Sequence, residues 1–391
     1  RESFPALGQG VAYFDGPGGS QVPAEVARAV GDAMISGLSN QGTVTLAEQR
    51  AEDVVTAGRA AVADLLGCVA SGVVFGRSMT QLTYDVARAL AKQWGEGDEV
   101  VVTRLDHDAN IRPWVHAAQS CGATVRWAEF DRDSAELPVA AVADLLSERT
   151  RLVAVTAASN LLGTRPDIPA IAQAAHAVGA LVYVDGVHLT PHAAVDVGEL
   201  GADLFVCSPY KFFGPHHGVL VADPSLLETV EPDKLLPSSN EVPARFELGT
   251  LPYELIAGTV AAVDFIAGFV PSEASRRKRV LSSMAAAEQH EEVLFERLIA
   301  GLRESPRVTL HGHPGRRTPT ALFSVEGCTP REVYEFLATK AVNAPASSFY
   351  ALEASRWMGL GDEGAVRAGL APYTNDDDVD RLVAGVAELT Q

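Results

Sequence analysis

The chain has 391 residues, and 47% of them are hydrophobic, which is enough for two or three packed units with sizeable cores. Its formal net charge is -19 at pH 7, and its densest basic stretch, residues 276–279, is short. This charge argues against nucleic acid and anionic membranes as partners. The sequence shows no signal peptide and no apolar run of 18 or more residues, so a soluble, cytoplasmic protein is expected.

The four cysteines, Cys68, Cys121, Cys207 and Cys328, are scattered along the chain. Their spacing fits neither a zinc site nor a disulfide framework, so no metal is expected and a reducing compartment is favoured. The chain begins with Arg1 rather than Met. A trimmed chain and a domain of a longer polypeptide are both open as interpretations.

From about residue 60 to 225, short β-branched apolar runs alternate with alanine-rich amphipathic stretches. This alternation predicts an α/β domain with a mostly parallel, seven-stranded sheet and helices on both faces. The expected strands are 73–75, 99–102, 124–128, 152–156, 181–184, 204–207 and 218–221. The expected helices between them are 82–93, 112–121, 140–148 and 168–178.

After about residue 255 the pattern changes and predicts a smaller α+β unit. Its expected elements are one long helical region at 254–303, strands at 308–310 and 320–325, and helices at 330–340 and 376–389. We therefore expect a large domain at 14–254 and a small domain at 255–391. Residues 1–13 are expected to pack on the small domain.

Lys211 lies in an apolar, glycine-rich segment, 208–218, and is one of only five lysines beside 26 arginines. A desolvated lysine amine has a lowered pKa and can form a Schiff base with an aldehyde, which is how proteins hold pyridoxal 5'-phosphate (PLP). The alternative is a lysine that extends its amine from a sheet edge into solvent. This segment alone leaves both readings open.

Several polar residues follow the expected strands, where ligands bind in open parallel sheets. They are Ser78, Thr80, His107, Asn110, Asn160, Asp185 and Lys211. A carboxylate at Asp185 would keep a pyridine nitrogen protonated, although a residue at a strand end can also cap a loop or helix. Ser78, Met79 and Thr80 precede a helix, so their N–H groups suit a phosphate; Ser78 could instead serve only as the helix cap.

Seven motifs in this order resemble the class V aminotransferase and cysteine desulfurase family of fold-type I PLP enzymes, and they cover nearly the whole chain. They are residues 13–21 (Tyr-Phe-Asp-Gly-Pro-Gly-Gly-Ser-Gln), 106–110 with Pro113-Trp114, 159–163, 185–188, 208–211, 247–250 and 366–370. Each motif by itself is weak evidence for the resemblance, whereas seven motifs in the family's order are strong evidence.

The resemblance implies roles for individual residues. It places His107 against the cofactor ring, Asn160 and His188 beside cofactor and substrate, Ser208 at the phosphate, Thr250 at the phosphate of the partner in a homodimer, and Arg367 at the substrate carboxylate. The alternatives are a core histidine at His107, a turn residue at Thr250 and a surface ion pair at Arg367.

Three departures from the family pattern bear on function. His188 stands where cysteine desulfurases usually carry glutamine, which predicts a group that titrates near neutral pH beside the cofactor. Tyr210 replaces a histidine that commonly precedes the lysine. Tyr350, on the loop 343–351, stands roughly where desulfurases carry their nucleophilic cysteine, and no cysteine follows Cys328. The chain therefore resembles the carbon-sulfur lyases of this family, which include thiocysteine lyase domains.

The sequence thus predicts a PLP-dependent carbon-sulfur lyase that acts by β-elimination on an L-cysteine-derived substrate: cysteine, cystine, thiocysteine or an S-conjugate, either free or tethered to a carrier. Lys211 would act as the base, Asp185 would hold the ring, and Tyr350 would line the pocket or donate to the leaving sulfur. The alternatives are an aminotransferase, an epimerase or a cysteine desulfurase of the same fold. An inactive binding module is disfavoured by Lys211, Asp185 and Arg367.

Overall fold

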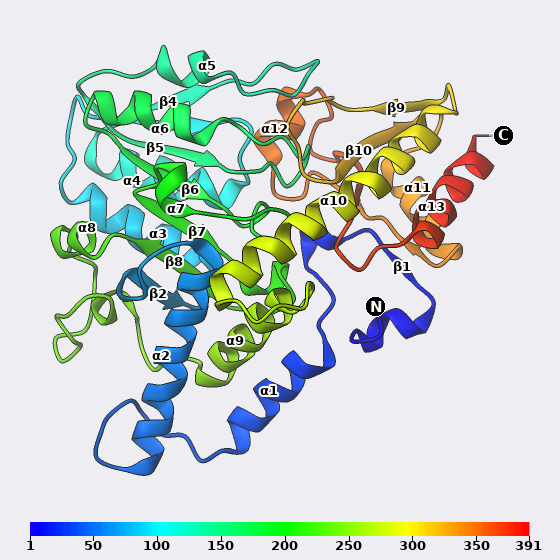
Figure 1. The fold of residues 1–391 in the computed structure, drawn as a ribbon. Helices are drawn as coiled ribbons and strands as arrows, with labels where there is room; N and C mark the ends of the chain where they lie inside the picture. Colours follow the sequence, from blue (N-terminus) through cyan, green and yellow to red (C-terminus); the bar gives the residue numbers. More distant parts are fainter. Residues whose placement is uncertain (391) are drawn as a thin grey trace.

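The computed structural model describes residues 1–390, and a seven-stranded sheet forms the centre of its larger part (Figure 1). The strand order is β2-β8-β7-β6-β5-β3-β4. The strands are β2 (Val73–Gly76), β3 (Glu99–Thr103), β4 (Thr124–Ala128), β5 (Thr150–Thr156), β6 (Leu181–Asp185), β7 (Leu204–Cys207) and β8 (Gly218–Ala222). Only β8 runs antiparallel to its neighbours among these strands. The predicted mostly parallel, seven-stranded sheet is confirmed.

Side chains of the central strands alternate between two apolar cores, one on each face of the sheet. In β6, Val182 and Val184 belong to one core and Tyr183 belongs to the other. The first core includes residues of α2 (Leu46–Leu66), α6 (Ile168–Ala177) and α9 (Tyr253–Ala267), and the second includes residues of α3 (Met79–Ala91), α4 (Arg112–Cys121) and α8 (Pro224–Thr229). Because both faces are covered, polar chemistry is confined to the strand ends.

The C-terminal part contains a four-stranded antiparallel sheet of order β12-β13-β10-β9. Its elements are β9 (Val308–Leu310), β10 (Thr320–Val325), α11 (Pro330–Thr339), β12 (Ala346–Ser347), α12 (Leu352–Trp357), β13 (Ala365–Gly369) and α13 (Asp376–Leu389). The remaining helices are α1 (Ala24–Ile35), α5 (Val139–Ala143), α7 (Val197–Leu200) and α10 (Arg276–Arg303), with short 3-10 helices at Pro5–Gln9, Gly16–Gly18, Ala70–Gly72, Asp108–Asn110, Pro209–Lys211 and Ala244–Phe246.

The N-terminal segment lies against the C-terminal part of the chain, as Figure 1 shows in blue and red. Strand β1 (Ala12–Tyr13) pairs in parallel with β11 (Val342–Asn343). Arg381 donates a hydrogen bond to the carbonyl oxygen of Gly10 at 2.6 Å. These contacts support our proposal that 1–13 and 255–391 form one domain and 14–254 the other.

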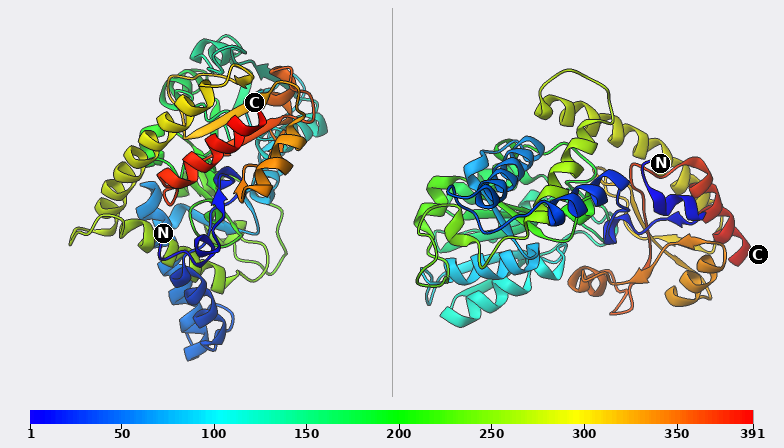
Figure 2. Two further views of the ribbon diagram at one scale, coloured as in Figure 1. Left: turned by 90° about the vertical axis from the view of Figure 1, so that its right-hand side faces the viewer. Right: turned by 90° about the horizontal axis from the view of Figure 1, so that it is seen from below.

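The long helical region predicted at 254–303 is present, but the structure divides it into two helices. Helix α9 ends at Ala267 and α10 begins at Arg276. Gly268 and Pro271 lie between them, and both residue types disfavour a helix interior. The N-terminal half of α10 packs in the core of the large sheet and its C-terminal half packs in the core of the small sheet, so α10 joins the two parts (Figure 2).

Other differences concern shorter elements. Helix α5 is shorter than the 140–148 that the sequence predicts. Helices α1, α2, α7, α8 and α12 and strands β1, β11, β12 and β13 were not predicted. None of the helices described within residues 1–390 is both long and apolar enough to cross a membrane.

We predict that Gly218→Ala lowers the stability of the protein by roughly 1–3 kcal/mol, the usual cost of overpacking. A Cβ at Gly218 would overlap the backbone of Ser78 and Met79, so the start of α3 would have to move. Thermal unfolding measures the loss. Gly31→Ala on α1 is the matched control, because its Cβ meets nothing within 4 Å and alanine favours a helix. Equal stability of both variants would contradict the prediction.

Candidate active site

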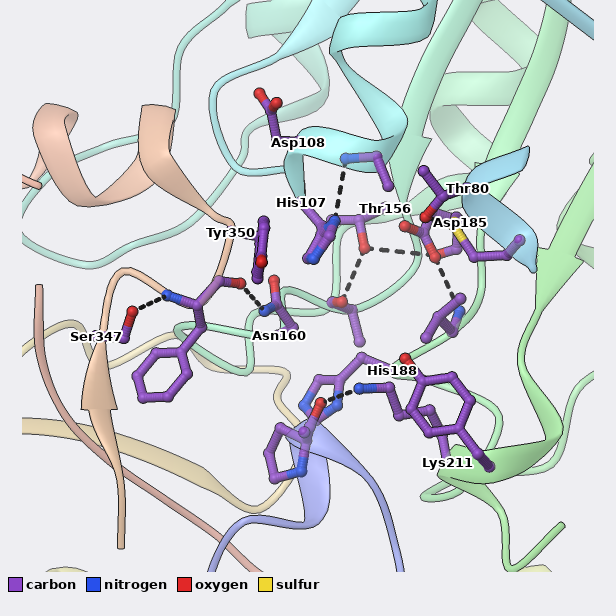
Figure 3. Close-up of a pocket in the computed structure, with 18 of the residues that line it drawn as sticks. Thr80, His107, Asp108, Thr156, Asn160, Asp185, His188, Lys211, Ser347 and Tyr350 are labelled. Atoms are coloured by element: carbon purple, nitrogen blue, oxygen red, sulfur yellow. Dashed lines mark hydrogen bonds between the residues drawn. The ribbon is translucent and has the colours of Figure 1, made fainter. Parts of the chain in front are cut away.

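A cavity of about 540 Å³ opens at the carboxyl ends of the parallel strands (Figure 3). It is lined by ten residues that the sequence singled out: Met79, Thr80, His107, Asn160, Asp185, His188, Tyr210, Lys211, Tyr350 and Arg367. Ser78, Ser208 and Thr250 are not among the lining residues of this chain. The sheet thus brings together side chains that are up to about 290 positions apart in the sequence.

Lys211 follows β7 and reaches into the cavity from the short helix Pro209–Lys211. Its amine donates a hydrogen bond to the carbonyl oxygen of Pro17 at 2.5 Å. The pKa of Lys211 is lowered to about 7, mainly by burial and also by the charge of Arg367, whereas the charge of Asp185 opposes this shift. A substantial fraction of this amine is therefore neutral, and able to act as a base, at neutral pH.

Asp185 is the last residue of β6, and its carboxylate accepts a hydrogen bond from the N–H of Val187 at 2.9 Å. Burial raises the pKa of Asp185 to about 6, while the Val187 N–H and the charge of Lys211 oppose this rise. The side chain is 4% exposed. A buried carboxylate of this kind gains most from a cationic partner in the cavity.

His107 begins the turn that follows β3, and its Nδ1 accepts a hydrogen bond from the N–H of Ala109 at 3.0 Å. In a neutral ring the proton therefore lies on Nε2. Burial lowers the pKa of His107 to about 4, with the charges of Lys211 and Arg367 adding to the effect. The neutral ring stacks on Tyr350, with ring centroids 5.6 Å apart.

Arg367 lies on β13 of the small sheet and is 2% exposed. Its Nη1 donates to the carbonyl oxygen of Asn160 at 2.8 Å, and its Nε has no partner. Burial lowers the pKa of Arg367 to about 9, with Asp15 opposing, so the guanidinium is charged at neutral pH. The side chain of Asn160 donates to the carbonyl oxygen of Phe349 at 2.9 Å, and its Oδ1 has no partner.

The N-terminus of α3 forms another wall of the cavity. Ser78 is the cap residue of this helix, and its hydroxyl accepts a hydrogen bond from the N–H of Gln81 at 3.1 Å. The capping alternative for Ser78 is therefore observed, while Met79 and Thr80 face the cavity. Ser208 is buried at 2% exposure, and Thr250 is exposed and away from the cavity of its own chain.

His188 does not behave as its motif predicts. Its Nε2 lies 3.0 Å from the hydroxyl oxygens of both Thr318 and Thr320, and its Nδ1 is buried without a partner. Burial, together with the nearby ring of His192, moves the pKa of His188 well below its ordinary value. The expectation that this group titrates near neutral pH is wrong, because the cavity wall keeps the ring neutral.

Two further residues at or beside the cavity, Asp15 and Phe349, were not predicted from the sequence. Asp15 accepts a hydrogen bond from Asn343 at 2.7 Å through Oδ2, and its Oδ1 is buried without a partner. The ring of Phe349 lies against the guanidinium of Arg367, 3.7 Å from ring centroid to guanidinium carbon. Asp15 lies inside a motif that the sequence identified, so it could have been found. Phe349 gave no such signal, because its position depends on the fold of the loop.

None of the four cysteines lines the cavity. Cys207 ends β7 and is fully buried, and burial raises the pKa of its thiol. Burial also raises the pKa of Cys68 to about 12. Neither thiol is available as a thiolate near neutral pH. Within residues 1–390, no group of three or more His, Cys, Asp and Glu side chains is placed to hold a metal ion.

Comparison with known proteins identifies the family. The profile described as Aminotransferase class-V matches residues 12–382. The chain belongs to this family. An uncharacterized protein of Mycobacterium tuberculosis is 37% identical over 393 residues, covering 100% of this chain and 98% of that protein. A cysteine desulfurase of Dickeya dadantii is 32% identical over 408 residues, covering 99% and 95%.

The fold agrees with solved structures. A cysteine desulfurase of Thermococcus onnurineus has a TM-score of 0.91 and 25% identity, covering 100% of this chain and 97% of that one. The predicted family resemblance and fold class are therefore confirmed. Class V aminotransferases use PLP.

The cavity fits PLP on its own chemistry. Lys211 supplies an amine of lowered pKa, Asp185 supplies a buried carboxylate, and the start of α3 supplies backbone N–H groups for an anion. Asn160, His188 and Arg367 each have a buried polar atom without a partner. Buried polar atoms are normally satisfied, so these atoms indicate ligand groups.

We predict that Lys211→Met raises the stability of the cofactor-free protein by roughly 2–4 kcal/mol below pH 7. The folded-state pKa of Lys211, about 7, lies below its ordinary value of 10.5, so folding disfavours the charged amine. This penalty is fully present below pH 7 and disappears as pH rises towards 10.5. Denaturant unfolding of both proteins at pH 6, 8 and 10 measures the difference. A gain that does not shrink with rising pH would contradict the prediction.

Proposed function

We propose that this protein is a PLP-dependent carbon-sulfur lyase that cleaves an L-cysteine-derived substrate by β-elimination. The observation that carries the proposal is that the cavity is lined by no cysteine, while Tyr350 lines it from the loop 343–351. A desulfurase passes the substrate sulfur to a protein thiol, and no thiol is present here to receive it. An elimination releases the sulfur directly and needs no such thiol.

The proposed reaction assigns a proton transfer to Lys211. PLP bound in the cavity would supply an electron sink for the negative charge at the substrate α-carbon. The neutral Lys211 amine takes the α-proton onto Nζ, for which its lowered pKa is suited. The bond between the β-carbon and sulfur breaks, and its electron pair leaves on sulfur as hydrosulfide, thiolate or hydropersulfide. Addition of water to the remaining three-carbon unit gives pyruvate and ammonia.

The remaining site residues would bind and orient. Asp185 would hold the proton on the pyridine nitrogen, and the neutral His107 would lie against the ring. The N–H groups at Met79 and Thr80 would face the phosphate, with Ser78 and Ser208 supporting that wall. Asn160 and His188 would contact the cofactor and substrate, and Arg367 would bind the substrate carboxylate.

An aminotransferase or an epimerase of the same fold is the alternative, because both would use Lys211, Asp185 and Arg367. An aminotransferase-like protein of Gibberella zeae is 33% identical over 407 residues. The outcomes differ in the fate of the substrate. A transaminase needs an added 2-oxo acid to turn over, and an epimerase returns the amino acid with inverted configuration.

We predict that replacing all four cysteines by Ser or Ala leaves the rate of sulfur elimination within about three-fold of the wild type, which is less than 1 kcal/mol in barrier height. The reason is that no cysteine lines the cavity. Sulfide release measures the rate. Circular dichroism controls for packing losses at Cys207, which is fully buried and behaves as a small hydrophobe. A protein-bound persulfide during turnover, lost with one particular cysteine, would instead establish the desulfurase mechanism.

A homodimer is part of the proposal. Thr250 and the neighbouring Leu248 are exposed and lie outside the cavity of their own chain, which supports a reach towards the phosphate of a partner subunit. We predict that the protein is a dimer by light scattering. Thr250→Ala should weaken PLP binding several-fold without dissociating the dimer, because one hydrogen bond to a charged group is lost. A monomer with full cofactor occupancy would contradict this.

A further inference from the structure

Phe349 covers one face of Arg367, one of the two arginines that line the cavity. The guanidinium carbon of Arg367 lies 3.7 Å from the centroid of the Phe349 ring. A cation over an aromatic face is attracted by the ring quadrupole, and the attraction is strongest where water is absent. Arg367 is 2% exposed, so this contact is desolvated.

The loop backbone is held in a strained form that places the ring there. Phe349 and Tyr350 both have positive φ angles, 52° and 59°, although neither is a glycine. Two hydrogen bonds keep this form. The carbonyl oxygen of Phe349 accepts from the Asn160 side chain at 2.9 Å (Figure 3). The carbonyl oxygen of Tyr350 accepts from the N–H of Asp108 at 2.7 Å.

The same asparagine also fixes the arginine. Its backbone carbonyl accepts from Nη1 of Arg367 at 2.8 Å, while its side chain holds Phe349. Asn160, Phe349 and Arg367 therefore form one closed set of contacts. Nε of Arg367 has no partner. The ring covers a face of the guanidinium, whereas the edge that carries Nε is left for a ligand.

We propose that Phe349 is a positioning residue that sets the preference of the site for substrates with a free α-carboxylate. The inference rests on the proposed function, in which Arg367 binds that carboxylate. The ring excludes water from the guanidinium face, which strengthens its attraction to an anion in a medium of low dielectric constant. It also fixes the guanidinium plane, which favours a two-point contact with a carboxylate.

The consequence concerns tethered substrates. An amino acid attached to a carrier through its carboxyl group has no negative charge to offer Arg367. The site selects against such an ester, thioester or amide. A carrier-bound substrate would have to be attached elsewhere, with its α-carboxylate free.

The test uses the PLP-loaded protein and two ligands that cannot lose sulfur, L-alanine and ethylamine, which differ only in the carboxylate. Calorimetry gives both dissociation constants for the wild type and for Phe349→Leu, which keeps an apolar side chain but removes the ring. Phe349→Leu should reduce the preference for L-alanine over ethylamine about tenfold. With substrate, it should raise KM more than it lowers kcat.

Tyr350→Leu is the matched control, because Tyr350 has the same backbone strain but stacks on His107 rather than Arg367. It should change the affinities for both ligands by the same factor. If Phe349→Leu leaves the preference unchanged, or weakens both ligands equally, the inference is overturned while the role of Arg367 stands. If the wild type shows no preference for L-alanine, the carboxylate role of Arg367 in the proposed function fails as well.

Discussion

Arg367, which is buried, and Lys211, which is partly buried, share one cavity, and neither has a carboxylate within ion-pairing distance in residues 1–390. Burial of charge without a paired counter-ion is costly, and for this reason burial lowers the pKa of both side chains. The rest of the fold must therefore hold them in place. Such a cavity favours anions, and an amino acid substrate and a phosphate-bearing cofactor both provide them.

The fold meets this demand by bringing two separate sheets to one place. Lys211 and Asp185 come from strand ends of the large sheet, whereas Arg367 comes from a strand of the small sheet. Helix α10 packs in the cores of both parts and so connects the two sheets. The distance between the amine and the guanidinium is thus set by packing far from the cavity, which makes the site sensitive to changes in that packing.

Much of the large sheet could be predicted from the sequence, because strands buried on both faces read as continuous apolar runs between amphipathic helices. The prediction of β7 at 204–207 and of α4 at 112–121 matches the structure in both bounds. Helix α2 could have been predicted as well, since Thr45 and Glu48 form a capping box that is visible in the sequence. The break between α9 and α10 was missed because their apolar patterns continue on either side of Gly268.

Site residues within motifs were predicted, and those defined only by three-dimensional contacts were not. The motifs placed Lys211, Asp185 and Arg367 in one cavity, as observed. Phe349 contacts Arg367 only because Phe349 and Tyr350 adopt left-handed backbone angles, and no sequence pattern predicts these angles. The neutral state of His188 likewise depends on burial, which its motif does not encode.

The fate of the three-carbon unit of the substrate tests the central claim most directly. Purified, PLP-loaded protein is given L-cysteine or L-cystine labelled with ¹³C, and the products are followed by NMR together with an ammonia assay. The account predicts labelled pyruvate and ammonia in equal amounts, with sulfur released into solution. Labelled alanine, formed in amounts equal to sulfur bound on the protein, would contradict it.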